Sequence, residues 1–432
     1  MKHLLLAVAT GLVCATPLAA QNRIDLIRPD APELAAFGPH PVGVRAGSFT
    51  DPGRIDVIAA SSVADAPTRD RVLEAEIWYP AAEGTEPGGT YQTILRDGVT
   101  PTELTGRAAR DAAPAEGQFP LVILSHGYPG NRYLMSHLAE NLASKGYVVV
   151  AADHPDSTYD DQGAFASTLV NRAVDQRFLL DSMAGLEDEV GAIIDTDQAA
   201  VIGYSMGGYG AMIFGGAGLS QTALQRTEPE RFVPPAGLLG RLGAGSDQHA
   251  ELVDPRVKAV IAIAPWGRQH DFWDAEGLGA FEKPLMLISG SADDVSVYEA
   301  IRQIFQQTTG TTRHLLTFDH ANHNAAAPMP APAEAWNYSE TLGRAPFDHY
   351  ADPVWDTVRM NNIAQHFATA FLDLHLKGDK AKGEYLDMVP NPDDGVWSVN
   401  DAGEPAADHS YWAGFPNRTA KGLRFETLGT GE

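Results

Sequence analysis

The chain has 432 residues, with 56 acidic and 31 basic side chains and a formal net charge of −25. So acidic a surface repels nucleic acid and anionic membranes, which excludes a nucleic-acid-binding function and favours neutral substrates. The sole cysteine is Cys14, which excludes an internal disulfide, a thiolate metal site and a cysteine nucleophile.

The first twenty residues have the layout of a secretory signal peptide. Lys2 is followed by an apolar run from Leu4 to Val13 and then by small residues up to Ala20. This order is typical of signal peptides, and the apolar run is too short to span a bilayer. We therefore predict cleavage near Ala20 and a secreted or periplasmic product without a membrane span.

The segment before the predicted core is less regular. Residues 21–41 contain four prolines and predict a surface arm. Val42–Ser48 and Val72–Trp78 are short alternating runs that predict antiparallel strands at the edge of a sheet. Residues 81–119 are rich in Gly, Pro, Thr and Ala, which indicates a long surface excursion.

From Pro120 onwards, apolar runs alternate with helical patterns, and this alternation predicts an α/β fold. Because the runs lack polar alternation, we expect a mostly parallel sheet buried on both faces by helices. The predicted strands are Leu121–Ser125, Tyr147–Ala152, Ala200–Ile202, Val257–Ala264, Pro284–Ser289 and His314–Phe318, and the longer predicted helices are Asn171–Ile194, Val297–Gln307 and Trp355–Leu376.

Two segments interrupt or extend this pattern. Residues 215–255 are expected to form a lid-like insertion that could roof a site. Residues 379–432 are expected to form a C-terminal extension packed on the main domain, which spans 21–378. The aromatic side chains of the extension are expected to pin it there rather than to bind a ligand; they are Trp397, Tyr411, Trp412 and Phe415.

One motif carries a specific chemistry. Gly203-Tyr204-Ser205-Met206-Gly207 reads G-x-S-x-G between a predicted strand and a predicted helix. Such an elbow holds its serine in a strained conformation above the sheet edge, at the N-terminus of the next helix. A glycine-rich turn with an incidental serine is the alternative. The strand before and the helix after favour Ser205 as a nucleophile.

A serine nucleophile needs a base and an acid, expected in the chain order Ser, Asp, His. The strand ending at Ser289 leads into Asp293 and Asp294, and we choose Asp293 as the acid. The strand ending at Phe318 leads into His320 and His323, and we choose His323 as the base. Other histidines, such as His270, His349 and His409, are expected to be solvated or structural.

The negative charge of a tetrahedral intermediate needs backbone N–H donors. We expect one donor from Met206 and one from Tyr128, in the loop after the first buried strand. A cluster of Asp156, Asp160 and Asp161 has no recognisable ligand spacing and is interpreted as a solvated loop. We predict no metal and no cofactor, and the oligomeric state stays open.

From Pro120 to Asn324 the chain resembles the α/β-hydrolase superfamily. Its SHGYPGNR, GYSMGG, GSADD and ANHN motifs are similar to those of dienelactone-hydrolase-like and platelet-activating-factor-acetylhydrolase-like serine esterases. More distantly it resembles bacterial polyester hydrolases. That resemblance implies that Tyr128 and Trp266 clamp an acyl or aromatic group of the substrate, with plain core packing as the alternative role of Trp266. Dienelactone hydrolases use a cysteine where this chain has Ser205, and minimal polyester hydrolases lack the insertion and the extension.

The sequence therefore predicts an exported serine carboxylic-ester hydrolase that acts through a covalent acyl-enzyme. Its partner would be a small-molecule or polymeric ester. Hydrolysis of an aromatic polyester or an acylated polysaccharide is one alternative. A non-catalytic ligand-binding protein on the same scaffold is an alternative of another class.

Overall fold

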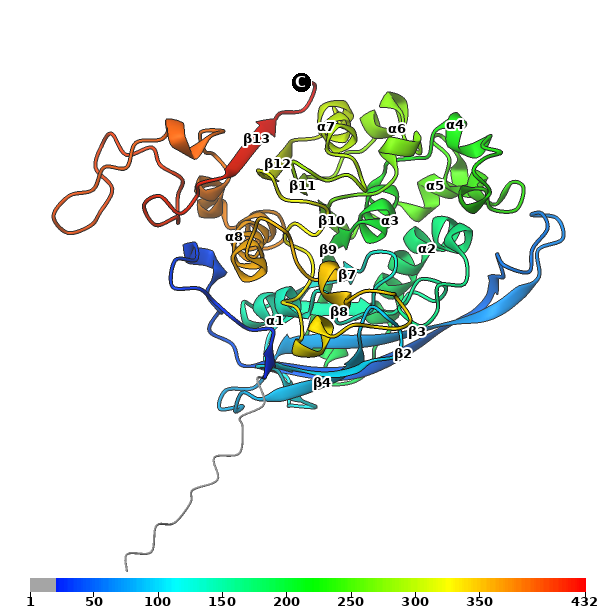
Figure 1. The fold of residues 1–432 in the computed structure, drawn as a ribbon, viewed down its shortest axis with the longest axis horizontal. Coiled ribbons are helices and arrows are strands. Elements are labelled where there is room, and N and C mark those ends of the chain that lie inside the picture. The colour runs from blue at the N-terminus through cyan, green and yellow to red at the C-terminus, as the bar shows by residue number, and fades with distance from the viewer. Residues whose placement is uncertain (1–20) are drawn as a thin grey trace, which may run out of the picture.

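A computed structural model describes residues 21–432, and the predicted signal peptide, 1–20, lies outside the described residues. At the centre of the described part is a ten-stranded sheet with the order β13-β12-β11-β10-β9-β7-β8-β3-β2-β6 (Figure 1). Strands β12 to β8 run parallel, whereas β13, β3 and β2 join by antiparallel pairing.

The central strands are β7 (Phe119–Ser125), β8 (Val148–Ala152), β9 (Ile194–Tyr204), β10 (Val257–Ile263), β11 (Leu285–Gly290) and β12 (Arg313–Phe318). All their apolar side chains are buried, apart from Phe119 at the start of β7. Burial on both faces explains why these strands read as continuous apolar runs. The predicted mostly parallel sheet, flanked by helices, is confirmed.

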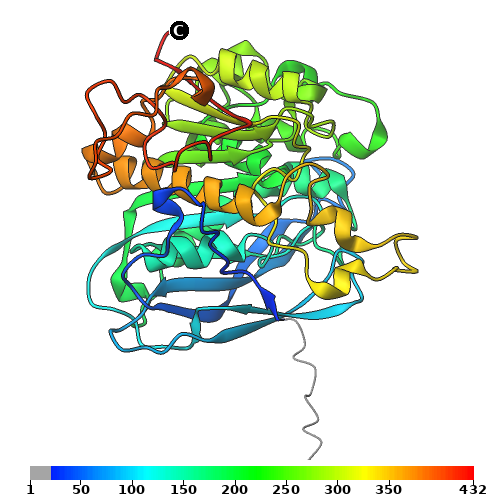
Figure 2. The same cartoon turned by 60° about the vertical axis from the view of Figure 1, so that its left-hand side comes forward.

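Helices cover both faces of the sheet (Figures 1 and 2). On one face, α1 (Ser136–Ser144) packs against α8 (Thr357–His375), and on the other α2 (Phe165–Ala184) packs against α3 (Met206–Gly215). Helix α7 (Tyr298–Gln307) lies beside β11 and β12. The short helices are α4 (Gln221–Leu224), α5 (Asp247–Leu252) and α6 (Ala275–Gly279).

Helix α2 lies earlier in the chain than predicted. The sequence predicted Asn171–Ile194, but the helix begins at Phe165 and ends at Ala184. Gly185 follows its last residue, and three acidic residues come next, at 187–189. Glycine favours a helix end, and negative charge is unfavourable beside the C-terminal end of a helix dipole.

The surface excursion predicted for 81–119 is wrong in part. Strands β4 (Gly89–Ile94) and β5 (Pro101–Gly106) form a hairpin, and β1 (Asn22–Arg23) extends it to a small three-stranded sheet. Its side chains Tyr91, Leu95 and Leu104 are fully buried. These strands are short and bounded by glycine and proline, which concealed their alternation.

The N-terminal edge of the large sheet consists of β2 (Val42–Ile55), β3 (Thr68–Pro80) and the short β6 (Ala109–Arg110). At the opposite edge, β13 (Leu423–Leu428) brings the end of the chain back onto β12. Of the aromatic residues in the C-terminal segment, Trp412 and Phe415 are buried, whereas Trp397 is 38% exposed. Within residues 21–432, no helix is both long enough and apolar enough to cross a bilayer.

Candidate active site

Ser205 occupies the sharp turn between β9 and α3. Its backbone has φ 53° and ψ −110°, a conformation that is strained for any residue except glycine. The two flanking glycines make this turn possible. A Cβ on Gly203 would lie 2.1 Å from the carbonyl oxygen of Gly207, and a Cβ on Gly207 would lie 1.9 Å from that of Ser125. Larger residues at these two positions cannot fit without moving the backbone.

The strained backbone is held in place by hydrogen bonds. The N–H of Ser205 donates to the carbonyl of Ile263, at the end of β10, over 2.8 Å. The carbonyl of Ser205 accepts from the N–H groups of Tyr209, at 2.9 Å, and Trp266, at 3.1 Å. The surrounding structure therefore fixes the direction in which the hydroxyl points.

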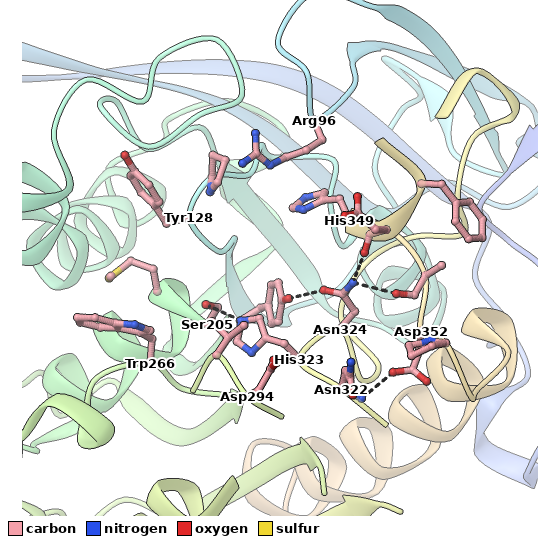
Figure 3. Close-up of a pocket in the computed structure, with 18 of the residues that line it drawn as sticks. Arg96, Tyr128, Ser205, Trp266, Asp294, Asn322, His323, Asn324, His349 and Asp352 are labelled. Atoms are coloured by element: carbon pink, nitrogen blue, oxygen red, sulfur yellow. Dashed lines mark hydrogen bonds between the residues drawn. The ribbon is translucent and has the colours of Figure 1, made fainter. Parts of the chain in front are cut away.

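The two chosen partners form a chain of contacts that begins at this serine. His323 Nε2 is 2.9 Å from Ser205 Oγ (Figure 3). His323 Nδ1 is 2.9 Å from Asp293 Oδ2. The other oxygen of Asp293 accepts the N–H groups of Val295 and Ser296, each at 2.9 Å. Asp293 is 4% exposed and cannot turn toward solvent without losing these bonds.

The neighbours that the sequence offered as alternatives lie differently. Asp294 is exposed and lines the rim of the cavity above Ser205. His320 is also exposed, has φ 65°, and donates its backbone N–H to Ser291 Oγ. Neither side chain reaches the Ser205–His323 pair by a hydrogen bond within the described residues.

Contacts with Tyr204 and with the segment 333–353 hold the loop that carries His323 in place. The ring of Tyr204 packs against His323 with centroids 5.2 Å apart, and its hydroxyl donates to Asn324 Oδ1 over 2.9 Å. The amide group of Asn324 donates in turn to the carbonyls of Asp348 and Ala351. The imidazole is thus oriented by the carboxylate on one side and by packing on the other.

The two expected oxyanion donors lie on either side of Ser205. Met206 is the first residue of α3, so its N–H has no acceptor within the helix. Tyr128 belongs to the loop after β7, and both residues line the same cavity as Ser205. A Cβ on Gly127 would lie 3.3 Å from that of Ser205. Glycine at 127 lets this loop pass close to the serine.

A buried hydrogen-bond network fixes the start of the loop that carries Tyr128. The guanidinium of Arg172 donates to the carbonyl of His126 and to Ser157 Oγ. The ring of His126 accepts the N–H of His154 at 3.2 Å and faces the carbonyl of Gly127 at 2.7 Å. The sequence gave no signal for these contacts because they join segments far apart in the chain.

The same network contains a second Ser, His and Asp set. Ser125 Oγ is 2.9 Å from His154 Nε2, and His154 Nδ1 is 3.0 Å from Asp175 Oδ2. All three residues are at most 1% exposed. A substrate cannot reach Ser125, so this set supports the fold and is not a second reaction centre.

Ser205 opens into a cavity of about 670 Å³, a size that is ordinary for a small-molecule site. One wall is aromatic. The ring of Phe165 lies edge-on to Tyr128, with centroids 4.9 Å apart, and to Trp266, at 5.1 Å. Phe232 supports Trp266 from behind at 5.1 Å. The two residues expected to clamp a substrate thus share one apolar wall.

The opposite wall is polar and comes from segments that the sequence did not mark. Arg96 follows β4, and Arg344, Asp348 and His349 belong to the segment 333–353, which contains the short helices η6 (Ala333–Trp336) and η7 (Pro346–His349). Burial lowers the pKa of His349 to about 3, and its Nε2 lies 2.9 Å from the hydroxyl of Tyr159. His349, which the sequence predicted to be solvated or structural, thus lines the site and is held by this contact.

The expectation that 215–255 roofs the site is wrong. None of the described residues that line the cavity comes from that insertion. Its contribution is indirect, since Phe232 packs on Trp266 and on His270. The segment 333–353 lines the cavity instead. Two hydrogen bonds hold it beside the site, one from the Asn324 side chain to the carbonyl of Asp348 and one from the hydroxyl of Ser339 to Asp97.

The acidic cluster interpreted as a solvated loop is solvated only in part, since Asp160 and Asp161 are exposed but Asp156 is buried. Asp156 is ion-paired with Arg69 and Arg71, and Asp161 accepts the backbone N–H of Asp156. Throughout residues 21–432, no group of three or more His, Cys, Asp or Glu side chains has an arrangement suited to a metal ion.

Comparison with known proteins supports the fold. Residues 120–216 match the family model described as alpha/beta hydrolase fold. A solved structure of a ferulic acid esterase from Streptomyces cinnamoneus superposes with a TM-score of 0.53 at 22% sequence identity, covering 81% of this chain and 94% of that one. At this level of identity the likeness concerns the fold alone.

Curated relatives match shorter stretches. Cutinase est2 of Thermobifida alba is 35% identical over 206 residues, which are 47% of this chain and 52% of the relative. Cutinase est1 of the same organism is 25% identical over 206 residues. Epoxide hydrolase B of Mycobacterium tuberculosis is 34% identical over only 95 residues. The chain thus spans about half the length of the cutinases that it matches.

Proposed function

We propose that this chain, which has the α/β-hydrolase fold, is an exported carboxylic ester hydrolase that uses Ser205, His323 and Asp293. The observation that carries the proposal is the unbroken line of two 2.9 Å contacts, from Ser205 Oγ to His323 and from His323 to Asp293. A serine on a strained elbow, a base within hydrogen-bond reach and a buried carboxylate behind it are what acyl transfer requires.

The reaction follows from these positions. As His323 Nε2 takes the hydroxyl proton, Ser205 Oγ attacks the ester carbonyl, and Asp293 stabilises the resulting imidazolium. The N–H groups of Met206 and Tyr128 receive the oxyanion. His323 then returns the proton to the departing alcohol, and the acyl group remains on Ser205. Water attacks that acyl-enzyme with His323 again as base, which releases the acid and restores the serine.

Turnover of 4-nitrophenyl acetate tests this proposal. We expect Ser205→Ala to remove activity, since no other group replaces the nucleophile. His323→Asn should lower kcat by about 1,000-fold or more, whereas His320→Asn is its matched control on the same loop. Asparagine tolerates the positive φ of residue 320, so this control should keep its activity. Full activity in Ser205→Ala would refute the proposal.

A non-catalytic binding protein on this scaffold makes a different prediction. It would bind an ester without turnover, and Ser205 would not react with a fluorophosphonate probe. Labelling of the wild-type protein, together with loss of labelling in Ser205→Ala, would exclude that alternative.

Hydrolysis of a polymeric ester is a second candidate, favoured by the cutinase relatives and by one surface feature. Trp336 and Tyr338 are 66% and 65% exposed on the segment 333–353, and the ring of Trp336 packs against that of the cavity residue Phe347 with centroids 4.1 Å apart. Exposed aromatic rings beside a site suit an extended apolar substrate. Soluble products released from a poly(ε-caprolactone) film, and their loss in Trp336→Ala with unchanged 4-nitrophenyl acetate turnover, would support this candidate.

Export rests on the sequence of residues 1–20, which has the order of a signal peptide. Expression of the full chain in a Gram-negative bacterium tests it. We expect the periplasmic fraction to hold a product that begins near Gln21, and a cytoplasmic product that keeps Met1 would contradict export.

A further inference from the structure

Arg96 is a cation in the wall of the cavity above Ser205. Arg96 lines the same cavity as Ser205, but none of the carboxylates in residues 21–432 lies within ion-pair distance of its guanidinium. By contrast, Arg344 on the same wall is paired with Asp348 at 2.8 Å. Other arginines, such as Arg172 and Arg226, also have no carboxylate partner and donate to backbone carbonyls instead. Within residues 21–432, Arg96 is the arginine that lines this cavity without an ion pair.

Burial makes this unpaired charge unfavourable. Desolvation lowers the pKa of Arg96, and the nearby charge of Arg344 adds to that effect, whereas Tyr159, Tyr350 and the more distant carboxylate of Asp348 oppose it without reversing it. Buried Arg71 shows the opposite behaviour, since its two carboxylate partners, Asp175 and Asp156, outweigh desolvation and raise its pKa. An arginine remains protonated in either case. Arg96 is therefore a partly desolvated cation whose hydrogen-bonding capacity faces the cavity.

The backbone around Arg96 is fixed, so its position does not depend on a mobile loop. Its N–H donates to the hydroxyl of Tyr350 over 3.0 Å. The next residue, Asp97, is 5% exposed and accepts hydrogen bonds from the N–H groups of Val99 and Thr100 and from the hydroxyl of Ser339. The site of the cation is thus preorganised.

Arg96 lies opposite the reacting serine. Figure 3 shows its side chain extending over the cavity between Tyr128 and His349, with Ser205 and Trp266 on the other side. The cavity therefore has an aromatic wall, formed by Tyr128, Phe165 and Trp266, and a cationic position at its far side. A planar guanidinium matches the two oxygens of a carboxylate in a bidentate arrangement.

We infer that Arg96 binds a carboxylate carried by the ester substrate, so that the cavity selects esters with an apolar or aromatic body and an anionic end. This inference rests on the proposed ester hydrolysis at Ser205. The carboxylate belongs either to the acyl part, as in the half-ester of a dicarboxylic acid, or to the alcohol part, as in an ester of a hydroxy acid. Arg96 is a specificity residue that holds the substrate and takes no part in the proton transfers.

Two matched pairs of substrates test the inference. For the acyl part, the mono-4-nitrophenyl ester of terephthalic acid is compared with 4-nitrophenyl 4-carbamoylbenzoate. For the alcohol part, 4-acetoxybenzoate is compared with 4-acetoxybenzamide. Each pair differs by one charge at nearly equal size, and the para-substituted ring prevents the carboxylate from attacking its own ester.

In the wild-type protein, kcat/KM for the anionic member should exceed that of the neutral member in one of the two pairs, and that pair identifies the part that carries the carboxylate. Arg96→Gln should lower this preference by about 10- to 100-fold, because a hydrogen bond to a charged group is lost. The change should lie in KM, since the carboxylate is bound in ground and transition states alike. Arg96→Lys should keep part of the preference. Arg344→Gln, which removes an arginine already paired on the same wall, should alter it much less.

Three results would overturn the inference: equal or poorer turnover of the anionic member in both pairs, an equal loss for both members in Arg96→Gln, or the same loss of preference in Arg344→Gln. Failure of the proposed function has a different signature, because the neutral esters would then not be hydrolysed at all or would be hydrolysed equally by Ser205→Ala. If neutral esters are hydrolysed in a way that requires Ser205, but the preference for anionic esters is absent or unaffected by Arg96→Gln, the inference alone is refuted.

Discussion

Asp175 is the carboxylate on which the buried network beneath the site depends. Its two oxygens lie 2.8 Å from Nε and Nη2 of Arg71, and one of them also lies 3.0 Å from Nη1 of Arg54. His154 Nδ1 approaches the other oxygen at 3.0 Å. The side chains of Asp175, Arg71 and Arg54 are 0%, 2% and 6% exposed. Little solvent is available to replace the carboxylate.

We predict that Asp175→Asn lowers the free energy of unfolding by about 3–5 kcal/mol, the usual effect of removing one partner from a buried ion pair. The amide keeps the size of the carboxylate but loses its charge. Its NH₂ group is a second donor facing guanidinium donors, so two buried cations are left undercompensated. Urea unfolding followed by far-UV circular dichroism at pH 7 measures the change.

Asp181→Asn is the matched control on the same helix. Asp181 pairs with Arg177 and Arg256, but its side chain is 47% exposed. Solvent screens such a pair, and the expected loss is about 0–1 kcal/mol. If Asp175→Asn costs no more than Asp181→Asn, the reasoning from buried charge is wrong.

The effect of Asp175→Asn should also depend on pH. Burial by itself raises the pKa of Asp175, but the charges of Arg71 and Arg54 and the bond from His154 outweigh it and hold the pKa well below its usual range. A depressed carboxyl pKa stabilises the fold above the unfolded value, which is about 3.9, and this contribution is lost as the pH falls further. The difference between wild type and variant should therefore be constant near neutrality and shrink below about pH 4.

Two further predictions concern the elbow and the acid stability of the fold. Gly207→Ala places a Cβ 1.9 Å from the carbonyl oxygen of Ser125 and should lower ester turnover by about 100-fold. In the control Gly240→Ala, the added Cβ meets nothing within 4 Å, so ester turnover should be unchanged. Equal activity of the two variants would contradict the packing argument. The free energy of unfolding should also fall between pH 7.5 and pH 5.5, by about 1.4 kcal/mol for each histidine that burial keeps neutral in the fold but that is protonated below about pH 6.5 in the unfolded chain. The urea midpoint reports this change, and a midpoint that is unchanged or higher at pH 5.5 would refute the prediction. Burial lowers the pKa to about 3 or 4 for His137, His154, His314, His349 and His366.

The sequence indicated the residues that lie at strand ends. Ser205, Asp293 and His323 each follow a buried parallel strand within a few residues, and the carboxyl ends of such strands meet at one edge of the sheet. Local signals were therefore enough to bring the three candidates together. The glycines of the elbow added a second local signal, because only a residue without a side chain fits there.

The polar wall of the cavity had no comparable signal. Arg96 is one arginine in a turn, and its place opposite Ser205 depends on contacts between distant segments. Asp97 and Ser339, which form one of these contacts, are 242 residues apart in the chain. The segment 333–353 likewise reaches the site through Asn324 and not through any pattern of its own. The substrate selection that we infer for Arg96 therefore depends on tertiary packing and not on a local sequence pattern.

The two Ser, His and Asp sets show why residue types alone do not define a reaction centre. Ser125, His154 and Asp175 are linked by contacts of 2.9 and 3.0 Å, almost the same as those of Ser205, His323 and Asp293. The difference lies in the backbone and in access. Ser125 ends a regular strand and has no exposed surface, whereas Ser205 stands on a strained turn that opens into the cavity. The same hydrogen-bond chemistry supports the fold where substrate is excluded, and it can activate a nucleophile only where the elbow presents the hydroxyl to a substrate.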